Sequence, residues 1–186
     1  MNNRQGYISY QLREMMKQSA IPSVFTDPQN PDDFIAGYVR AIGPKTCLIE
    51  SIGPYGRYEG WFAMRLSCVI EVMQDEQYAQ RLLRLMELNG EQERGLPDDK
   101  QNWTDGDCMA LLLSYAMENQ RVVTCWTADE AFTGLVDQLD DLYATMVLLD
   151  FMGRSCAEQK IKLVDVELAS LGSEEEMMYE KLNADK

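Results

Sequence analysis

The chain contains no histidine among its 186 residues. Histidine is the commonest general base near neutral pH, the usual nitrogen ligand of zinc and the central residue of Ser–His–Asp triads. Its absence argues against these three chemistries, although other groups can catalyse reactions. No stretch approaches the about 20 apolar residues of a membrane-spanning helix. The N-terminus leads into a helical pattern with charges rather than an apolar signal core, so we expect a cytoplasmic protein with no membrane partner.

Disulfide and metal chemistry are also weakly represented. The five cysteines are an odd number with no CxxC spacing, and most stand in apolar runs, which predicts buried free thiols. The neighbouring carboxylates Asp32-Asp33 and Asp140-Asp141 could bind Mg²⁺ or Ca²⁺. Both pairs stand in turn contexts, where Asp is favoured for local hydrogen bonds to the backbone. We therefore expect no metal site, no cofactor and no catalytic residues.

Charge is distributed unevenly along the chain. The formal net charge is −14, of which residues 1–86 contribute nothing, residues 87–103 contribute −3 and residues 104–186 contribute −11. A strongly acidic surface repels phosphate backbones and anionic membranes, because binding to them depends on Lys and Arg. Any contact with nucleic acid is therefore expected in the first half.

The sequence repeats itself at a constant offset of 97 positions. Seven identities occur at this offset, on glycines, apolar strand-like positions and a Gly-Arg pair. They are Gly37/Gly134, Val39/Val136, Gly56-Arg57/Gly153-Arg154, Leu66/Leu163, Val69/Val166 and Leu85/Leu182. This clustering favours an internal duplication. It predicts a first repeat over 1–86, an acidic linker over 87–103 that we expect to be mobile, and a second, acidic repeat over 104–186.

The apolar periodicity predicts the same order of elements in both repeats. The expected strands are 23–26, 34–42, 46–52, 61–66 and 67–72 in the first repeat, and 122–127, 131–139, 143–150, 157–163 and 164–169 in the second. The first helix is expected around the apolar stripe of Ile8, Leu12, Met15 and Met16 and ends at Ala20-Ile21-Pro22. Further helices are expected after an Asp75 cap, after a capping box at Thr104, and after a capping box at Ser173 and Glu176. The pattern predicts an α+β fold of two tandem five-stranded, strongly bent β-barrels, each with an N-terminal helix and a short C-terminal helix.

This order resembles the Sm/LSm-like family, whose fold is an SH3-like barrel behind an N-terminal helix. The first family motif is matched by Gly37 with Val39 and by Gly134 with Val136 and Asp140. The second is matched by Met64-Arg65-Leu66 with Val69 and by Ile161-Lys162-Leu163 with Val166. In the family, an Asn and an Arg line an RNA-binding pore. Cys47 and Ala144 replace the Asn here, whereas Arg65 and Lys162 keep a cation.

The resemblance also bears on assembly. Family members pair the fourth strand of one copy with the fifth strand of the next and build rings. A tandem chain could satisfy this pairing internally or supply two sectors of a ring.

A second candidate site is the loop around Gly56, in which Tyr55 and Tyr58 flank Arg57. Aromatic rings beside a cation suit stacking on bases or contact with a phosphate. The alternative is a structural turn whose tyrosines cover the end of the barrel. The residues that we consider for RNA or ligand contact are therefore Tyr55, Arg57, Tyr58, Arg65 and Lys162.

These patterns favour a non-enzymatic, Sm-like binding or assembly module that acts through a protein partner or through self-association. The alternative is an RNA-binding regulator that uses the basic and aromatic face of the first repeat. Two further hypotheses are an acidic mimic of nucleic acid and an enzyme that uses carboxylates between the two repeats.

Overall fold

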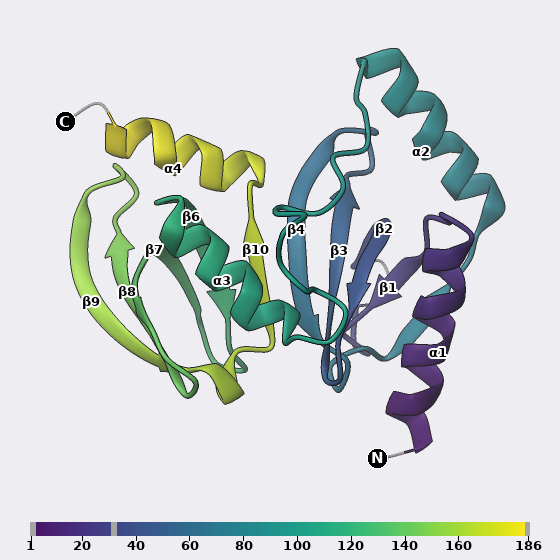
Figure 1. Cartoon of the computed structure of the whole chain (residues 1–186). Coiled ribbons are helices and arrows are strands. Elements are labelled where there is room, and N and C mark those ends of the chain that lie inside the picture. The colour runs from purple at the N-terminus through teal and green to yellow at the C-terminus, as the bar shows by residue number, and fades with distance from the viewer. Residues whose placement is uncertain (1–2, 31–32, 185–186) are drawn as a thin grey trace.

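The computed structural model describes residues 3–30 and 33–184 and has an α+β fold (Figure 1). Within these ranges, ten strands form one antiparallel sheet in the order β5-β1-β2-β3-β4-β10-β6-β7-β8-β9, and the sheet is not closed. The elements of the first half are α1 (Asn3–Lys17), β1 (Ser23–Phe25), β2 (Phe34–Ile42), β3 (Thr46–Ile52), β4 (Tyr58–Arg65), β5 (Glu71–Met73) and α2 (Glu76–Asn89). Those of the second half are α3 (Cys108–Glu118), β6 (Val122–Trp126), β7 (Ala131–Leu139), β8 (Tyr143–Leu149), β9 (Ser155–Lys162), the 3₁₀ turn η1 (Leu163–Asp165), β10 (Leu168–Leu171) and α4 (Glu174–Ala184). Two separate barrels, as the sequence predicts, are not confirmed, because the strands of both halves belong to one sheet.

The two halves share their strand order and their irregularities. The order β5-β1-β2-β3-β4 of the first half recurs as β10-β6-β7-β8-β9 in the second. The bounds of β2, β3 and β4 recur in β7, β8 and β9 at the offset of 97 positions. The register shift between Val39 and Ala41 recurs between Val136 and Gln138 at the same offset. The internal similarity of the sequence therefore has a counterpart in the backbone.

The halves are connected by antiparallel pairing of β4 with β10, which we call the joint. Met64 lies opposite Leu168, Ala63 opposite Ala169, and Trp61 opposite Leu171. This pairing satisfies backbone hydrogen bonds that β4 and β10 would otherwise expose as sheet edges. It places two segments about a hundred residues apart side by side in the middle of the molecule (Figure 1).

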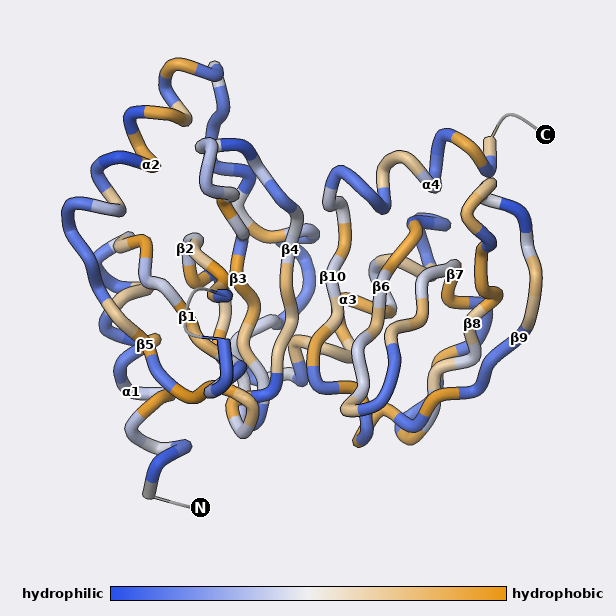
Figure 2. Tube along the Cα trace, turned by 180° about the vertical axis from the view of Figure 1, so that it is seen from behind, coloured by the Kyte–Doolittle hydropathy of each residue, from blue (hydrophilic) through white to orange (hydrophobic). Residues whose placement is uncertain are grey.

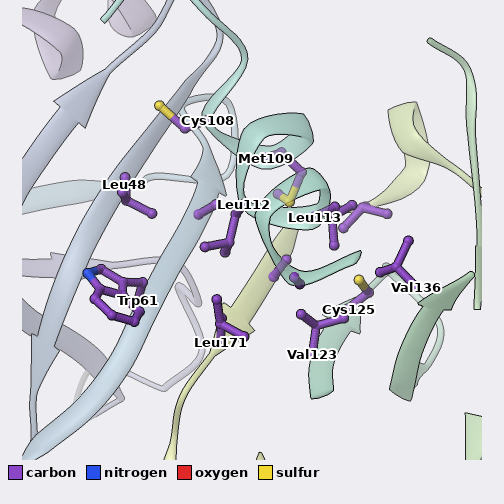
Figure 3. Packing of buried hydrophobic residues seen from close by; sticks show 14 of the residues in the cluster. Leu48, Trp61, Cys108, Met109, Leu112, Leu113, Val123, Cys125, Val136 and Leu171 are labelled. Atoms are coloured by element: carbon purple, nitrogen blue, oxygen red, sulfur yellow. The ribbon is translucent and has the colours of Figure 1, made fainter. Parts of the chain in front are cut away.

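Helix α3 fills the space between the halves. On one side it packs inside the curve of the second half, against Val123, Cys125 and Val136. On the other side it contacts the outer face of the first half at Leu48 and Trp61 (Figure 3). Both faces of β3 are buried as a result, because α1 packs against the opposite face.

Among the residues that the structure describes, no helix covers the outer face of β9 in the way that α3 covers the first half, and this face is polar. The first-half residues Ala41, Leu48, Trp61 and Ala63 belong to the core around α3. At the offset of 97 positions they correspond to Gln138, Thr145, Glu158 and Lys160. The exposed β9 carries the two charged residues of this set. The same positions are therefore apolar in the half that packs against α3 and polar in the half that does not.

The segment between α2 and α3 is tied to the first half. The buried carboxylate of Glu50 accepts hydrogen bonds from the backbone N–H groups of Arg94 (2.7 Å) and Gly95 (3.0 Å). Trp61 Nε1 donates to the Gly95 carbonyl at 2.8 Å, and the ring of Trp103 is buried. The sequence suggests a mobile linker, whereas these contacts hold the segment against the first half. The sequence shows no sign of them, because the carboxylate that anchors the segment, that of Glu50, lies far away along the chain.

The local predictions have mixed outcomes. Asp75 caps α2, and Ser173 and Glu176 form the predicted capping box, with the Ser173 N–H donating to Glu176 Oε2 at 2.9 Å. The capping box at Thr104 is wrong: α3 begins at Cys108 and is capped by Asp107. The hydrophobic and hydrophilic residues that alternate along α2 and α4 are visible in Figure 2.

The sequence predictions for the paired aspartates and for the cysteines can be compared with the structure. Asp140 accepts backbone hydrogen bonds from Leu142 and Tyr143, which confirms its role in a turn and holds its pKa below the ordinary value. Asp32 lies outside the described residues. The cysteines are free; Cys47, Cys108 and Cys125 are buried, Cys68 is half-buried, and Cys156 is exposed. Within the described ranges, no group of three or more Cys, Asp or Glu residues is placed to hold a metal ion. No helix among these residues is long and apolar enough to cross a membrane.

Candidate functional site

A groove of about 640 Å³ opens over the joint, between the start of α4 and the loop that connects β3 to β4. We call it the junction groove. Its lining comes from both halves and consists of Gly53, Tyr55, Arg57, Tyr58, Glu59, Phe62, Glu91, Arg94, Thr124, Trp126, Ser170, Ser173, Glu174, Glu175, Met177 and Met178. The volume lies within the range of about 300 to 1,000 Å³ that is typical of ligand sites.

The floor of the groove is aromatic. Phe62 on β4 and Trp126 on β6 flank β10, and their rings stack with centroids 6.5 Å apart and an interplanar angle of 19°. Between them on β10 stands the small Ser170, which lies opposite Phe62. Both rings are half-buried and line the groove, so they present apolar surface to it.

The first wall is the β3–β4 loop, which is held by α2. Gly56 has a φ of +69°, and a Cβ atom there would lie 2.4 Å from Leu85 Cβ on α2. Asn89 Nδ2, at the end of α2, donates to the carbonyls of Tyr55 (2.8 Å) and Gly56 (3.3 Å). This close approach explains the repeated glycine, because a Cβ atom at Gly153 (φ +71°) would likewise lie 2.6 Å from Leu182 Cβ on α4. The clamped loop carries the side chain of Tyr55 into solvent, where 75% of its surface is exposed.

The second wall is the first turn of α4, which is anchored to β6 by a buried carboxylate. Glu176 accepts hydrogen bonds from the Thr124 N–H at 3.1 Å, from Ser170 Oγ and from the Ser173 N–H. Burial nevertheless raises the pKa of Glu176 above its ordinary value. With Glu176 facing inward, its neighbours Glu174 and Met178 line the groove, and Met178 is 57% exposed.

Acidic groups outnumber basic groups along the groove. Partial burial, and then the nearby charge of Glu174, raise the pKa of the Glu59 carboxyl above its ordinary value. Glu91 pairs with Arg94 at 3.6 Å, and the Arg94 guanidinium covers the ring of Tyr58 at 3.8 Å. Setting this pair aside, three carboxylates and one guanidinium line the groove: Glu59, Glu174, Glu175 and Arg57.

The structure divides the five predicted contact residues between two places. Tyr55, Arg57 and Tyr58 line the junction groove, and Arg57 makes no ion pair within the described ranges. Tyr55 is free to stack on a ligand, whereas Tyr58 is buried under Arg94. The Tyr58 hydroxyl finds no hydrogen-bond partner among the residues that the structure describes, and burial raises its pKa.

Arg65 and Lys162 lie elsewhere, along a cavity of about 680 Å³ that is lined mostly by the second half and also by Arg65, Ser67 and Cys68 of the first. Arg65 Nε donates to the Val166 carbonyl at 2.7 Å, and Arg65 Nη2 donates to the Leu163 carbonyl, so this guanidinium crosses the joint. The Lys162 side chain is exposed at the end of β9. Acidic side chains share this cavity, among them Asp129, Glu130, Asp165 and Glu167.

Several residues of the groove were not identified as a site from the sequence. Phe62 and Trp126 stand on strands of different halves. Their proximity depends on the insertion of β10 between β4 and β6. From the sequence alone, Glu174 is interpreted as a carboxylate that stabilises a helix N-terminus. Phe62, Trp126 and Glu174 come together only because β4 pairs with β10. No local sequence pattern indicates this pairing.

No protein-family model matches the chain, and comparisons with curated proteins and with solved structures found no significant match.

Proposed function

We propose that this protein is a non-enzymatic binding module that acts through protein–protein interaction. The observation that carries the proposal is the junction groove, with half-exposed aromatic rings on its floor and exposed Tyr55 and Met178 on its walls. Apolar surface gathered in a groove and rimmed by polar residues is typical of protein interaction sites. The Sm/LSm-like relationship remains a prediction.

The sheet ends favour a different protein over a second copy of the chain. A second copy that repeated the joint would pair its β5 with β9 of the first. In β4, the joint uses Trp61, Phe62, Ala63 and Met64, and Gly60 directly precedes them. The corresponding positions of β9 hold Glu158, Gln159, Lys160 and Ile161, and Ala157 corresponds to Gly60.

The glycine matters most for this comparison. A Cβ atom at Gly60 would lie 2.7 Å from the Leu171 carbonyl oxygen and 2.8 Å from the Ser173 nitrogen. Ala157 carries such an atom. Charged side chains on an edge strand also oppose pairing. Both features support a single two-repeat unit that binds something other than itself.

The test is native mass spectrometry of the protein isolated from its own cells under conditions that preserve complexes. A stoichiometric protein partner, free of nucleotide mass and lost on substitution of Tyr55 and Met178 by Ala, is the expected result. Complexes that persist in this variant would contradict the role of the groove. Added mass that disappears after ribonuclease treatment would contradict the protein-binding proposal.

RNA binding is the second candidate, and it is favoured by the state of Arg57. The corresponding Arg154 pairs with Asp150 at 2.8 Å, but Gly53 stands at the position of Asp150 in the first half. Arg57 is therefore available beside the exposed ring of Tyr55. Under this alternative, Arg57→Glu abolishes binding of a single-stranded RNA, measured by fluorescence anisotropy, whereas Arg84→Glu on the exposed side of α2 does not.

A further inference from the structure

We propose that the junction groove binds a basic amphipathic segment of a partner protein, with apolar side chains on Phe62 and Trp126 and a Lys or Arg facing Glu59 and Glu174. This inference rests on the proposed function and adds the chemistry of the partner.

The apolar face of the proposed segment is inferred from the apolar side chains that line the groove. Four apolar side chains converge from four elements: Phe62 from β4, Trp126 from β6, Met178 from α4 and Tyr55 from the β3–β4 loop. Flexible methionine beside aromatic rings adapts to partners of varied shape. A segment with apolar residues on one face would cover all four at once, as in helix-in-groove recognition.

The basic part follows from the charges around this floor. Glu59 and Glu174 lie near enough for the charge of Glu174 to disfavour ionisation of Glu59. The helix N-terminus of α4 offsets part of the charge of Glu174 and Glu175. The only other charge without a pairing partner in the described lining is Arg57, so the groove keeps a negative excess. A cation placed between Glu59 and Glu174 would stabilise both carboxylates.

The charge of the whole chain favours the same partner. The formal net charge is −14, and residues 104–186 contribute −11 of it. A field of this sign attracts basic segments, and it repels acidic peptides, nucleic acid and a second copy of the chain. A basic partner is thus favoured both at long range and within the groove.

The experiment uses three labelled peptides and the full-length protein, with binding measured by fluorescence anisotropy. The first peptide carries Leu at helical spacing with Lys elsewhere. The second has the same pattern with Glu in place of Lys, and the third has the same number of Lys residues with Ser in place of Leu. We expect the Leu/Lys peptide to bind, the Leu/Glu peptide not to bind, and the Ser/Lys peptide to bind at least tenfold more weakly, by analogy with about tenfold per apolar anchor.

Matched variants separate the groove from non-specific attraction to an acidic protein. Tyr55→Ala with Met178→Ala should weaken Leu/Lys binding about tenfold. Its control is Tyr10→Ala with Met73→Ala, which removes two comparably exposed side chains outside the groove. Glu174→Gln should weaken binding severalfold, whereas Glu158→Gln, which removes an equal charge from β9, should change it less than about twofold.

Each contrary result has a defined meaning. Equal binding of the Leu/Lys peptide to all variants, or no binding, overturns the inference. Preferential binding of the Leu/Glu peptide that is lost in the Tyr55/Met178 variant also overturns it, but leaves the groove as a protein-binding site and the proposed function intact. Displacement of the Leu/Lys peptide by single-stranded RNA, with loss of RNA binding in Arg57→Glu, overturns it in favour of RNA.

Discussion

Arg65 donates a hydrogen bond to the Val166 carbonyl at 2.7 Å and thereby connects the end of β4 to the segment that leads into β10. A second N–H of the same guanidinium reaches the Leu163 carbonyl. The residue that the Sm-like resemblance suggests for phosphate contact therefore holds the two halves together. Lys162, at the corresponding position of the second half, ends β9, which is the last strand of the sheet within the described residues.

We expect Arg65→Ala to lower the free energy of unfolding by about 1.5 to 3 kcal/mol, because two hydrogen bonds from a charged donor are lost. Urea unfolding followed by circular dichroism measures the change. Lys162→Ala is the matched control and should stay within about 0.5 kcal/mol of the wild type, as exposed substitutions usually do. Similar losses in both variants would show that Arg65 does not stabilise the joint.

Gly56→Ala should destabilise the protein more than Gly90→Ala, although both glycines have a φ of +69°. The positive φ alone costs an alanine about 1 to 2 kcal/mol. At Gly56 the added Cβ would also meet Leu85 Cβ at 2.4 Å, whereas at Gly90 nothing lies within 4 Å. Thermal unfolding of the two variants separates the steric part from the backbone part. Equal melting temperatures would mean that the loop moves away from α2 without cost.

Glu176 should make stability depend on pH in a defined direction. Its pKa is raised in the folded protein, so between the ordinary value of 4.5 and that raised value the native state holds more protons than the unfolded state. The unfolding free energy of the wild type should therefore rise, relative to Glu176→Gln, as the pH falls through this window, and level off below it. Urea unfolding of both proteins at a series of pH values tests this. Parallel pH profiles would contradict it.

Transfer of the joint surface to β9 should create self-association. The variant combines Ala157→Gly, Glu158→Trp, Gln159→Phe and Lys160→Ala, which copies residues 60–63 of β4. Removal of the Cβ clash and of the charges opens β9 to pairing with β5 of a second copy. Light scattering after size-exclusion chromatography should show a mass that rises with concentration in the variant. A mass equal to that of the wild type would mean that other features block this pairing.

The strands that the sequence predicted most accurately are bounded by turn residues such as Gly, Pro and Asp. The observed bounds of β2, β3 and β7 coincide with the predicted ones. β4 begins at Tyr58 rather than at residue 61. The glycines predicted a turn up to Gly60, but a bulge at Glu59 and Gly60 allows the pairing with β3 to start earlier. Residues 163–165 were expected in a strand and form a 3₁₀ turn instead, which allows the chain to reach the joint.

Only part of the candidate site could be read in advance. The sequence placed Tyr55, Arg57 and Tyr58 in one loop, but it did not connect Phe62 with Trp126. The burial of Tyr58 beneath Arg94 was equally hidden, because Arg94 belongs to a segment expected to be mobile. Contacts of this kind join distant residues, whereas periodicity and turn chemistry report only on neighbours in the chain.

The sequence by itself determined the α+β class, the internal repetition and the uneven charge, because these follow from local periodicity and from composition. Only the tertiary structure decided that β4 pairs with β10, that α3 serves both halves and that a groove lies over their junction. The physical reason is the burial of α3 on two sides. One apolar face of α3 is buried in the second half, and the other is buried against Leu48 and Trp61 of the first. This second contact brings β4 and β10 side by side, so that they pair.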